Sequence, residues 1–97
     1  MSNDISLPHR LRASPSVLCT VMSDGSFVLM DVNSGVFYQL GGVAARLWSL
    51  WQDDATVMPG LETILDEYGV EREELIRDVQ ELLRDLLAQN LIIVSDI

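Results

Sequence analysis

Three short apolar segments separated by small polar residues stand between Val17 and Leu40. Ser23-Asp24-Gly25 separates the first segment from the second, and Asn33-Ser34-Gly35 separates the second from the third. Small polar residues with Gly between runs of Val, Leu, Phe and Tyr are typical of tight antiparallel hairpins. The pattern therefore predicts three antiparallel strands in sequence.

The third predicted strand, Val36-Phe37-Tyr38-Gln39-Leu40, is apolar on both faces. Such a strand is usually buried on both sides, but the pattern supplies no obvious fourth strand beside it. A free strand edge next to uncovered apolar surface is a place where another peptide can add as a strand. Phe37 and Tyr38 point to opposite faces, so one of them is a candidate ligand contact, and the pattern leaves open which. A terminal strand at 91–94 or a dimer mate are the alternative occupants of the edge.

Helical periodicity follows the strands. Residues 43–51 place Val43, Leu47, Leu50 and Trp51 on one face, which predicts a first helix. Thr56 is a candidate N-cap for a second helix with Pro59 in its first turn, and Gly69 is its expected stop. We expect this second helix to bury the apolar residues at helical spacing: Leu61, Ile64, Leu65 and Tyr68.

The third predicted helix has the clearest pattern in the chain, and Asn90 can end it. Seven apolar residues recur at spacings of one, three and four, which gives a wide core-facing stripe. A short apolar segment at 91–94 follows, as a strand or a plug. Residues 1–15 contain Pro8 and Pro15 and read as a flexible N-terminal arm, which leaves residues 16–97 as one domain. The stripe consists of Leu75, Ile76, Val79, Leu82, Leu83, Leu86 and Leu87.

Composition excludes several classes of protein. The 97 residues include six Arg, no Lys and fifteen acids, for a net charge of −9. Such a surface repels phosphate backbones and anionic membranes, so we expect no nucleic-acid or membrane partner. No apolar run approaches the ~20 residues that span a bilayer, and the N-terminus lacks a secretory pattern. We therefore expect a cytoplasmic protein.

Few residues suit catalysis. Cys19 is the single cysteine and alternates with Val17 and Val21, so we expect a buried core thiol. His9 is the single histidine and is expected on the surface, which leaves no conventional metal set. We expect neither a cofactor nor an enzyme. Trp48 is expected in the core, whereas Trp51 is equally suited to the core and to a partner.

The order of these elements resembles the PqqD-like family, the peptide-recognition domains of ribosomally made, modified peptides. The stand-alone members of lasso-peptide pathways are the most similar. One departure is Pro59-Gly60, where the family often has an acid, which suggests a late start for the second helix. The matching residues are Asp31, Gly35, Phe37, Tyr38 and Leu40; Ala44, Ala45 and Trp48; Thr56, Ile64, Leu65 and Tyr68; and Asp78, Val79, Leu82, Leu83, Leu86, Asn90, Leu91 and Ile92.

The resemblance implies an α+β, winged-helix-like fold with a three-stranded antiparallel sheet followed by three helices. It also implies that a precursor's leader segment adds to the third strand and lies against the last helix. A leader peptidase, and possibly a cyclase, would then receive the precursor from a monomer or weak dimer. The alternatives are a winged helix-turn-helix DNA binder, which the acids of the last helix disfavour, and a structural homodimer. The implied leader-binding residues are Val36, Phe37, Tyr38, Gln39, Leu40, Ile76, Arg77, Asp78, Val79 and Leu82.

Overall fold

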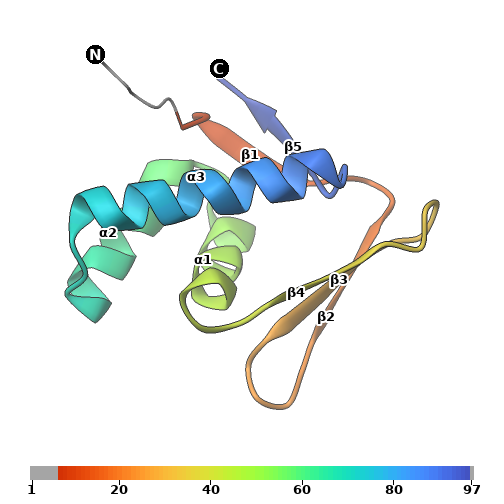
Figure 1. Ribbon diagram of the computed structural model, residues 1–97, viewed down its shortest axis with the longest axis horizontal. Helices are drawn as coiled ribbons and strands as arrows, with labels where there is room; N and C mark the ends of the chain where they lie inside the picture. Colours follow the sequence, from red (N-terminus) through yellow and green to blue (C-terminus); the bar gives the residue numbers. More distant parts are fainter. Residues whose placement is uncertain (1–6, 97) are drawn as a thin grey trace.

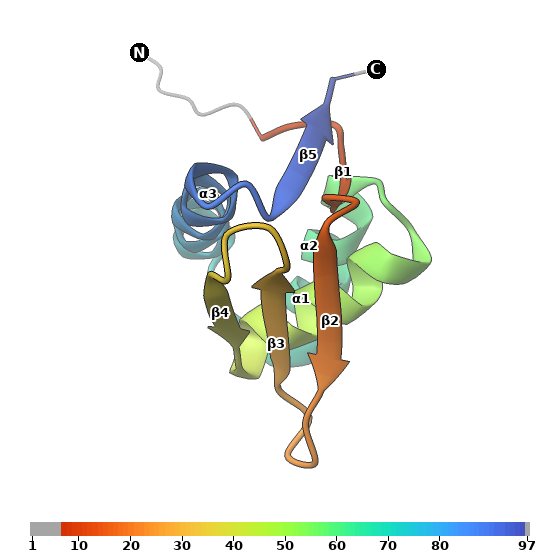
Figure 2. The same ribbon diagram turned by 90° about the vertical axis from the view of Figure 1, so that its right-hand side faces the viewer.

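A three-stranded antiparallel sheet forms one side of the molecule. The computed structural model describes residues 7–96. Strands β2 (Val17–Val21), β3 (Phe27–Asp31) and β4 (Phe37–Leu40) pair in the order β2-β3-β4, so β4 is an edge strand (Figure 2). The three predicted strands are thereby confirmed, and the third begins at Phe37. Leu29 lies opposite Cys19 in β2 and Tyr38 in β4.

A second, two-stranded sheet joins the two ends of the described chain. Strand β1 (Arg10–Ala13) pairs antiparallel with β5 (Ile92–Ser95), and Leu11, opposite Val94, is 2% exposed. Residues 10–13 of the predicted N-terminal arm therefore belong to the folded domain, while residues 1–6 lie outside the described residues. The terminal strand predicted at 91–94 exists, but its partner is β1, so it does not cover β4.

Three helices follow the larger sheet: α1 (Gly42–Asp53), α2 (Val57–Tyr68) and α3 (Arg72–Ala88) (Figure 1). The chain reaches α2 through Asp54, whose Oδ1 accepts the Thr56 N–H at 3.0 Å. The helix starts at Val57, so the late start suggested by Pro59-Gly60 is wrong: Pro lacks only an N–H that the first turn leaves unpaired anyway. Gly69 ends α2 in the left-handed conformation, as predicted, with φ of 65°.

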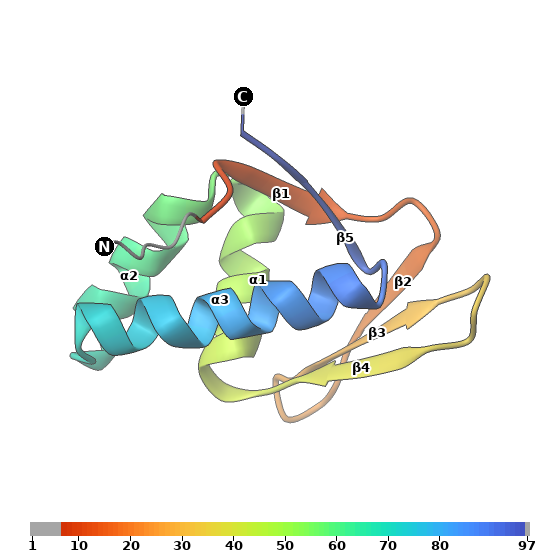
Figure 3. The ribbon, with the colours of Figure 1, turned by 45° about the horizontal axis from the view of Figure 1, so that its top comes forward.

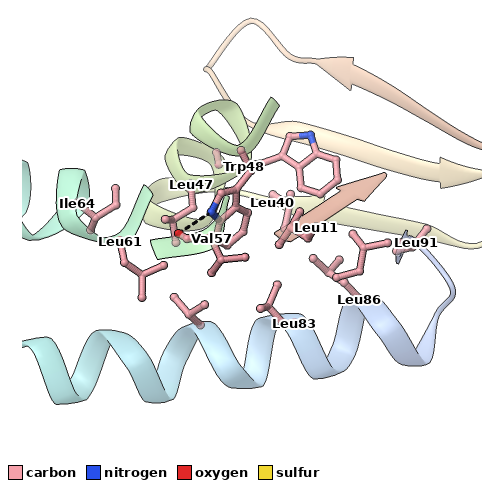
Figure 4. Close-up of a cluster of buried hydrophobic side chains, with 14 of the residues drawn as sticks. Leu11, Leu40, Leu47, Trp48, Val57, Leu61, Ile64, Leu83, Leu86 and Leu91 are labelled. Atoms are coloured by element: carbon pink, nitrogen blue, oxygen red, sulfur yellow. Dashed lines mark hydrogen bonds between the residues drawn. The ribbon is translucent and has the colours of Figure 1, made fainter. Parts of the chain in front are cut away.

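The core lies between the sheets and helices (Figure 4). Trp48 is 1% exposed, which confirms its predicted core position. Trp51 is 2% exposed, and its indole N–H donates to the Val57 carbonyl at 3.2 Å, so Trp51 also belongs to the core and ties α1 to the start of α2. Leu83 and Leu86 of α3 and Leu11 of β1 complete this packing.

Three positions predicted as buried are exposed. The Cys19 residue is exposed even though its Sγ accepts the Trp48 indole N–H at 3.2 Å. Its strand, β2, is the edge of the sheet opposite β4, so one flank of Cys19 has no neighbouring strand to cover it. Tyr68 is 49% exposed at the last residue of α2, and Leu87 is 41% exposed near the end of α3. Helix ends extend past the core, so periodicity overestimates burial there.

The turn that places β4 is organised by Asp31. This residue is 7% exposed, and its carboxylate accepts the Asn33 amide at 3.1 Å and the Ser34 hydroxyl at 3.1 Å. Hydrogen bonds from the Ser16 hydroxyl, the Asn33 amide and the Ser34 hydroxyl lower the pKa of Asp31. The ionised form therefore fixes the turn between β3 and β4.

We expect Asp31→Asn to destabilise the domain most at neutral pH. A carboxyl whose pKa is lowered in the folded state adds stability above its unfolded pKa and loses it as pH falls through the folded pKa. The stability difference between the wild type and Asp31→Asn should therefore shrink at pH values below 3.8, the ordinary pKa. Urea unfolding across this range measures it, with Asp66→Asn on the exposed face of α2 as the control. If Asp31→Asn lost the same amount of stability at neutral and at acid pH, the result would contradict a role for the charge of Asp31.

Candidate functional site

Strand β4 has hydrogen-bonding groups that β3 does not use. Asp31 donates its N–H to the Val36 carbonyl at 3.0 Å, and the register then places Tyr38 opposite Leu29. Along an antiparallel strand, the backbone N–H and C=O groups of successive residues point alternately to the partner strand and away from it. The N–H and C=O groups of Phe37 and Gln39 therefore point to the open edge, where no strand of the described chain pairs with them. The free edge predicted from the sequence is confirmed, and its donors are identified.

The side chains of β4 point alternately to the two faces of the sheet. Phe37 is 67% exposed on the outer face, and Gln39 is also exposed. On the other face, Leu40 is in the core and Tyr38 is half-buried, with its hydroxyl donating to Asp85 Oδ2 of α3 at 3.3 Å. Partial burial, followed by the nearby Asp85, raises the pKa of Tyr38. Of the two aromatic candidates, Tyr38 faces α3.

An apolar groove of about 330 Å³ lies between the beginning of α1 and the first half of α3. Strand β4 leads directly into α1 (Figure 3), and Gly41, which joins the two, lines the groove. Its rim carries two exposed carboxylates, Glu74 and Asp78. The remaining lining comes from small and apolar residues of both helices and the segments before them: Gly41, Val43, Ala44, Leu47, Val70, Leu75, Val79 and Leu82.

The structure brings together some of the residues predicted for the site and separates others. Asp78, Val79 and Leu82 line the groove. Ile76 is half-buried against the core, and Arg77 lines a different hollow on the outer side of α3, which Asp78 also lines. Val36 is half-buried just before β4. Of the two charged candidates on α3, Asp78 is therefore the one at the groove.

Residues at the start of α1 were not predicted as site residues. Val43, Ala44 and Leu47 form one wall of the groove. The helical pattern assigned Val43 and Leu47 to a core-facing stripe, and Leu47 is indeed 1% exposed. Ala44 could have indicated this wall from the sequence, because a small side chain beside larger apolar residues leaves room on a helix face.

No feature of the described chain suggests bound metal or a membrane span. Within residues 7–96, no three His, Cys, Asp or Glu residues lie together as a metal site would require. In the same range no helix is both long and apolar enough to cross a bilayer. His9 is exposed, and its backbone carbonyl accepts the Val57 N–H at 2.9 Å.

The fold and the site together define a small α+β domain with one strand edge open beside an apolar groove. The family model described as "Coenzyme PQQ synthesis protein D (PqqD)" matches residues 26–92, which include β3, β4 and all three helices. This chain belongs to that family. A search of curated proteins finds no significant sequence match.

Two solved structures are similar to this chain over most of its length. One, "TbiB1 in Complex with the TbiA(beta) Leader Peptide", has a TM-score of 0.76 and 28% identity over 84% of this chain and 93% of the other. The second, "Lasso peptide synthetase B1 complexed with the leader peptide", has a TM-score of 0.76 and 26% identity over 87% and 98%. These similarities agree with the family expected from the order of elements in the sequence.

Proposed function

We propose that this protein binds the leader segment of a ribosomally made precursor peptide, which adds as an antiparallel strand to β4. The observation that carries the proposal is the pair of open hydrogen-bonding positions, Phe37 and Gln39, beside the groove of α1 and α3. Both similar structures are described as complexes with a leader peptide. In this arrangement the backbone of β4 holds the leader, and Asp78, Val79 and Leu82 contact its side chains.

The interactions available here suit reversible binding. Each backbone hydrogen bond contributes a net ~0.5–1.5 kcal/mol, and buried apolar surface adds about 25 cal/mol per Å². Ordering a flexible leader costs roughly 2–5 kcal/mol of this gain. Affinity in the nanomolar-to-micromolar range is the expected balance, which permits release to a later enzyme.

The protein would then act as an adaptor without chemistry of its own. We propose that it works in the cytoplasm as a monomer or weak dimer and presents the precursor to a leader peptidase and then to a cyclase. Holding two partners together raises the effective concentration of the substrate. We also propose that β3, β4 and the helices form a winged-helix-like arrangement. The peptide binds at the open edge of its wing, strand β4. Ile76 supports α3 from the core, and Arg77 flanks the site.

Amide hydrogen exchange by NMR tests the strand addition. On titration with a synthetic leader from a lasso-type precursor encoded beside this protein's gene, the Phe37 and Gln39 amides should become protected. The Tyr38 amide should change little, because the register already directs it to Leu29. Protection confined to another part of the chain would contradict binding at β4.

The adaptor role has its own test. A purified leader peptidase from the same pathway should cleave the precursor faster when this protein is present, and this protein alone should leave the precursor intact. Cleavage by this protein alone, or a peptidase indifferent to it, would overturn the adaptor proposal while leaving peptide binding to be judged by the exchange experiment.

A further inference from the structure

Four carboxylates form a row along one side of α3. Glu74, Asp78, Glu81 and Asp85 follow one another at spacings of four, three and four residues, which keeps them on one helix face. Glu74 and Asp78 are on the rim of the groove, and Asp85 accepts the hydroxyl of Tyr38. Asp85 and Glu81 both lie near enough to Tyr38 to help raise its pKa. The row therefore borders the space between α3 and β4 from the groove to Tyr38.

Cations inside the described chain do not neutralise this row by direct contact. The two ion pairs described between residues 7 and 96 are Arg46–Glu67, at 2.7 Å, and Arg72–Glu62, at 3.0 Å. Neither pair includes a carboxylate of the row. Arg77 and Arg84 line the outer hollow of α3 together with Asp78 and Glu81. The groove lining itself contains no cation to oppose Glu74 and Asp78.

The spacing of the row is somewhat shorter than the side-chain repeat of an added strand, by about 1–2 Å per step. An α-helix rises about 1.5 Å per residue, so successive carboxylates of the row are roughly 4.5–6 Å apart along the axis. Side chains on one face of a strand repeat about every 6.8 Å. Alternate residues of a strand along β4 can therefore meet the groove and then successive carboxylates.

We propose that the peptide recognised at β4 places an apolar side chain in the groove, followed two or four residues later by Lys or Arg paired with the carboxylate row. This inference rests on the proposed function, since it names the class of leader that the same site selects. The order follows from direction: β4 runs from Tyr38, beside Asp85, to Leu40, next to the groove. An antiparallel ligand runs the opposite way and meets the groove first.

The charge and the apolar lining of the site favour a peptide with an apolar residue followed by a basic one over an acidic or polar peptide. Val43, Leu47, Val79 and the other apolar lining residues offer no partner for a polar group at the floor of the groove. An acidic leader would bring like charges against the row in a protein whose net charge is already −9. A basic residue two or four positions after an apolar one satisfies both parts of the site.

The test is a selection of displayed random peptides on the purified protein, followed by affinity measurements. Selected sequences should carry Lys or Arg two or four residues after an apolar residue. For one selected peptide, the variant Glu81→Gln/Asp85→Asn, which neutralises the carboxylates beyond the groove towards Tyr38, should bind about 5- to 20-fold more weakly, as expected for two partly exposed charge pairs. The control Glu73→Gln/Asp66→Asn removes the same charge from exposed positions outside the row and should change the affinity less than about twofold.

Replacing the basic residue of the selected peptide with Gln completes a double-mutant cycle. The Gln peptide should bind the wild type and Glu81→Gln/Asp85→Asn equally, which shows that the lost affinity belongs to the pairing. Selected peptides that protect the amides of Phe37 and Gln39 but lack the basic residue, or losses that simply add, would overturn this inference and leave strand addition standing. Peptides that bind without protecting those amides would overturn both.

Discussion

Gln39→Pro should weaken leader binding by roughly 30- to 150-fold and leave the domain folded. The Gln39 N–H points to the open edge of β4, so proline removes a donor that only the ligand uses, and its ring hinders the approaching strand. A lost hydrogen bond and an unpaired ligand carbonyl together cost about 2–3 kcal/mol. Isothermal titration calorimetry with a leader peptide measures the loss, and circular dichroism checks the helices.

Two matched variants separate this effect from general damage to the sheet. Val21→Pro places proline at the open edge of β2, on the opposite side of the same sheet, and should leave binding nearly unchanged. Gln39→Ala keeps the N–H and removes the exposed side chain, so it should also bind normally. A folded Gln39→Pro variant with wild-type affinity would refute strand addition at β4.

Ala44→Phe should reduce leader binding by roughly 10- to 150-fold by filling the groove. Ala44 is half-buried on the α1 wall, and a phenyl ring there would occupy part of the 330 Å³ that an incoming side chain needs. Excluding one apolar ligand side chain forfeits about 1.5–3 kcal/mol of burial. Titration with the same leader peptide measures the change.

Ala88→Phe is the control for added aromatic surface on a helix. Ala88 is the exposed last residue of α3 and does not line the groove, so this variant should bind as the wild type does. Equal weakening by both substitutions would show that the groove is not where leader side chains are buried.

Local patterns predicted most of the elements, but not the strand whose partner is distant in sequence. The two Gly-containing turns located β2, β3 and β4, and helical spacing located the helices. Strand β1 was missed because Leu11 stands between two arginines and near two prolines, a segment with little strand signal of its own. This segment forms a strand because it pairs with β5, not because of its own composition.

The sequence predicted the β4 and α3 parts of the candidate site and missed the α1 wall. The free edge of β4 followed from the strand pattern, because strand alternation is local, whereas Asp78, Val79 and Leu82 were implied by the family resemblance. The α1 wall did not follow, since apolar residues that line a groove and apolar residues in a core have the same pattern. The choice between Phe37 and Tyr38 required the position of α3, which a strand pattern does not contain.

The pairing of β1 with β5 also constrains the order of folding. Joining Arg10 to Ser95 closes a loop of almost the whole chain, and the entropic cost of closure grows with loop length. The hairpins and helices close much shorter loops, so they can form first and bring the two strands together. During synthesis, Leu11 must wait for Val94 to be made before it can be covered by its partner. The nascent chain can therefore form the open edge of β4 before its own terminal strands are joined.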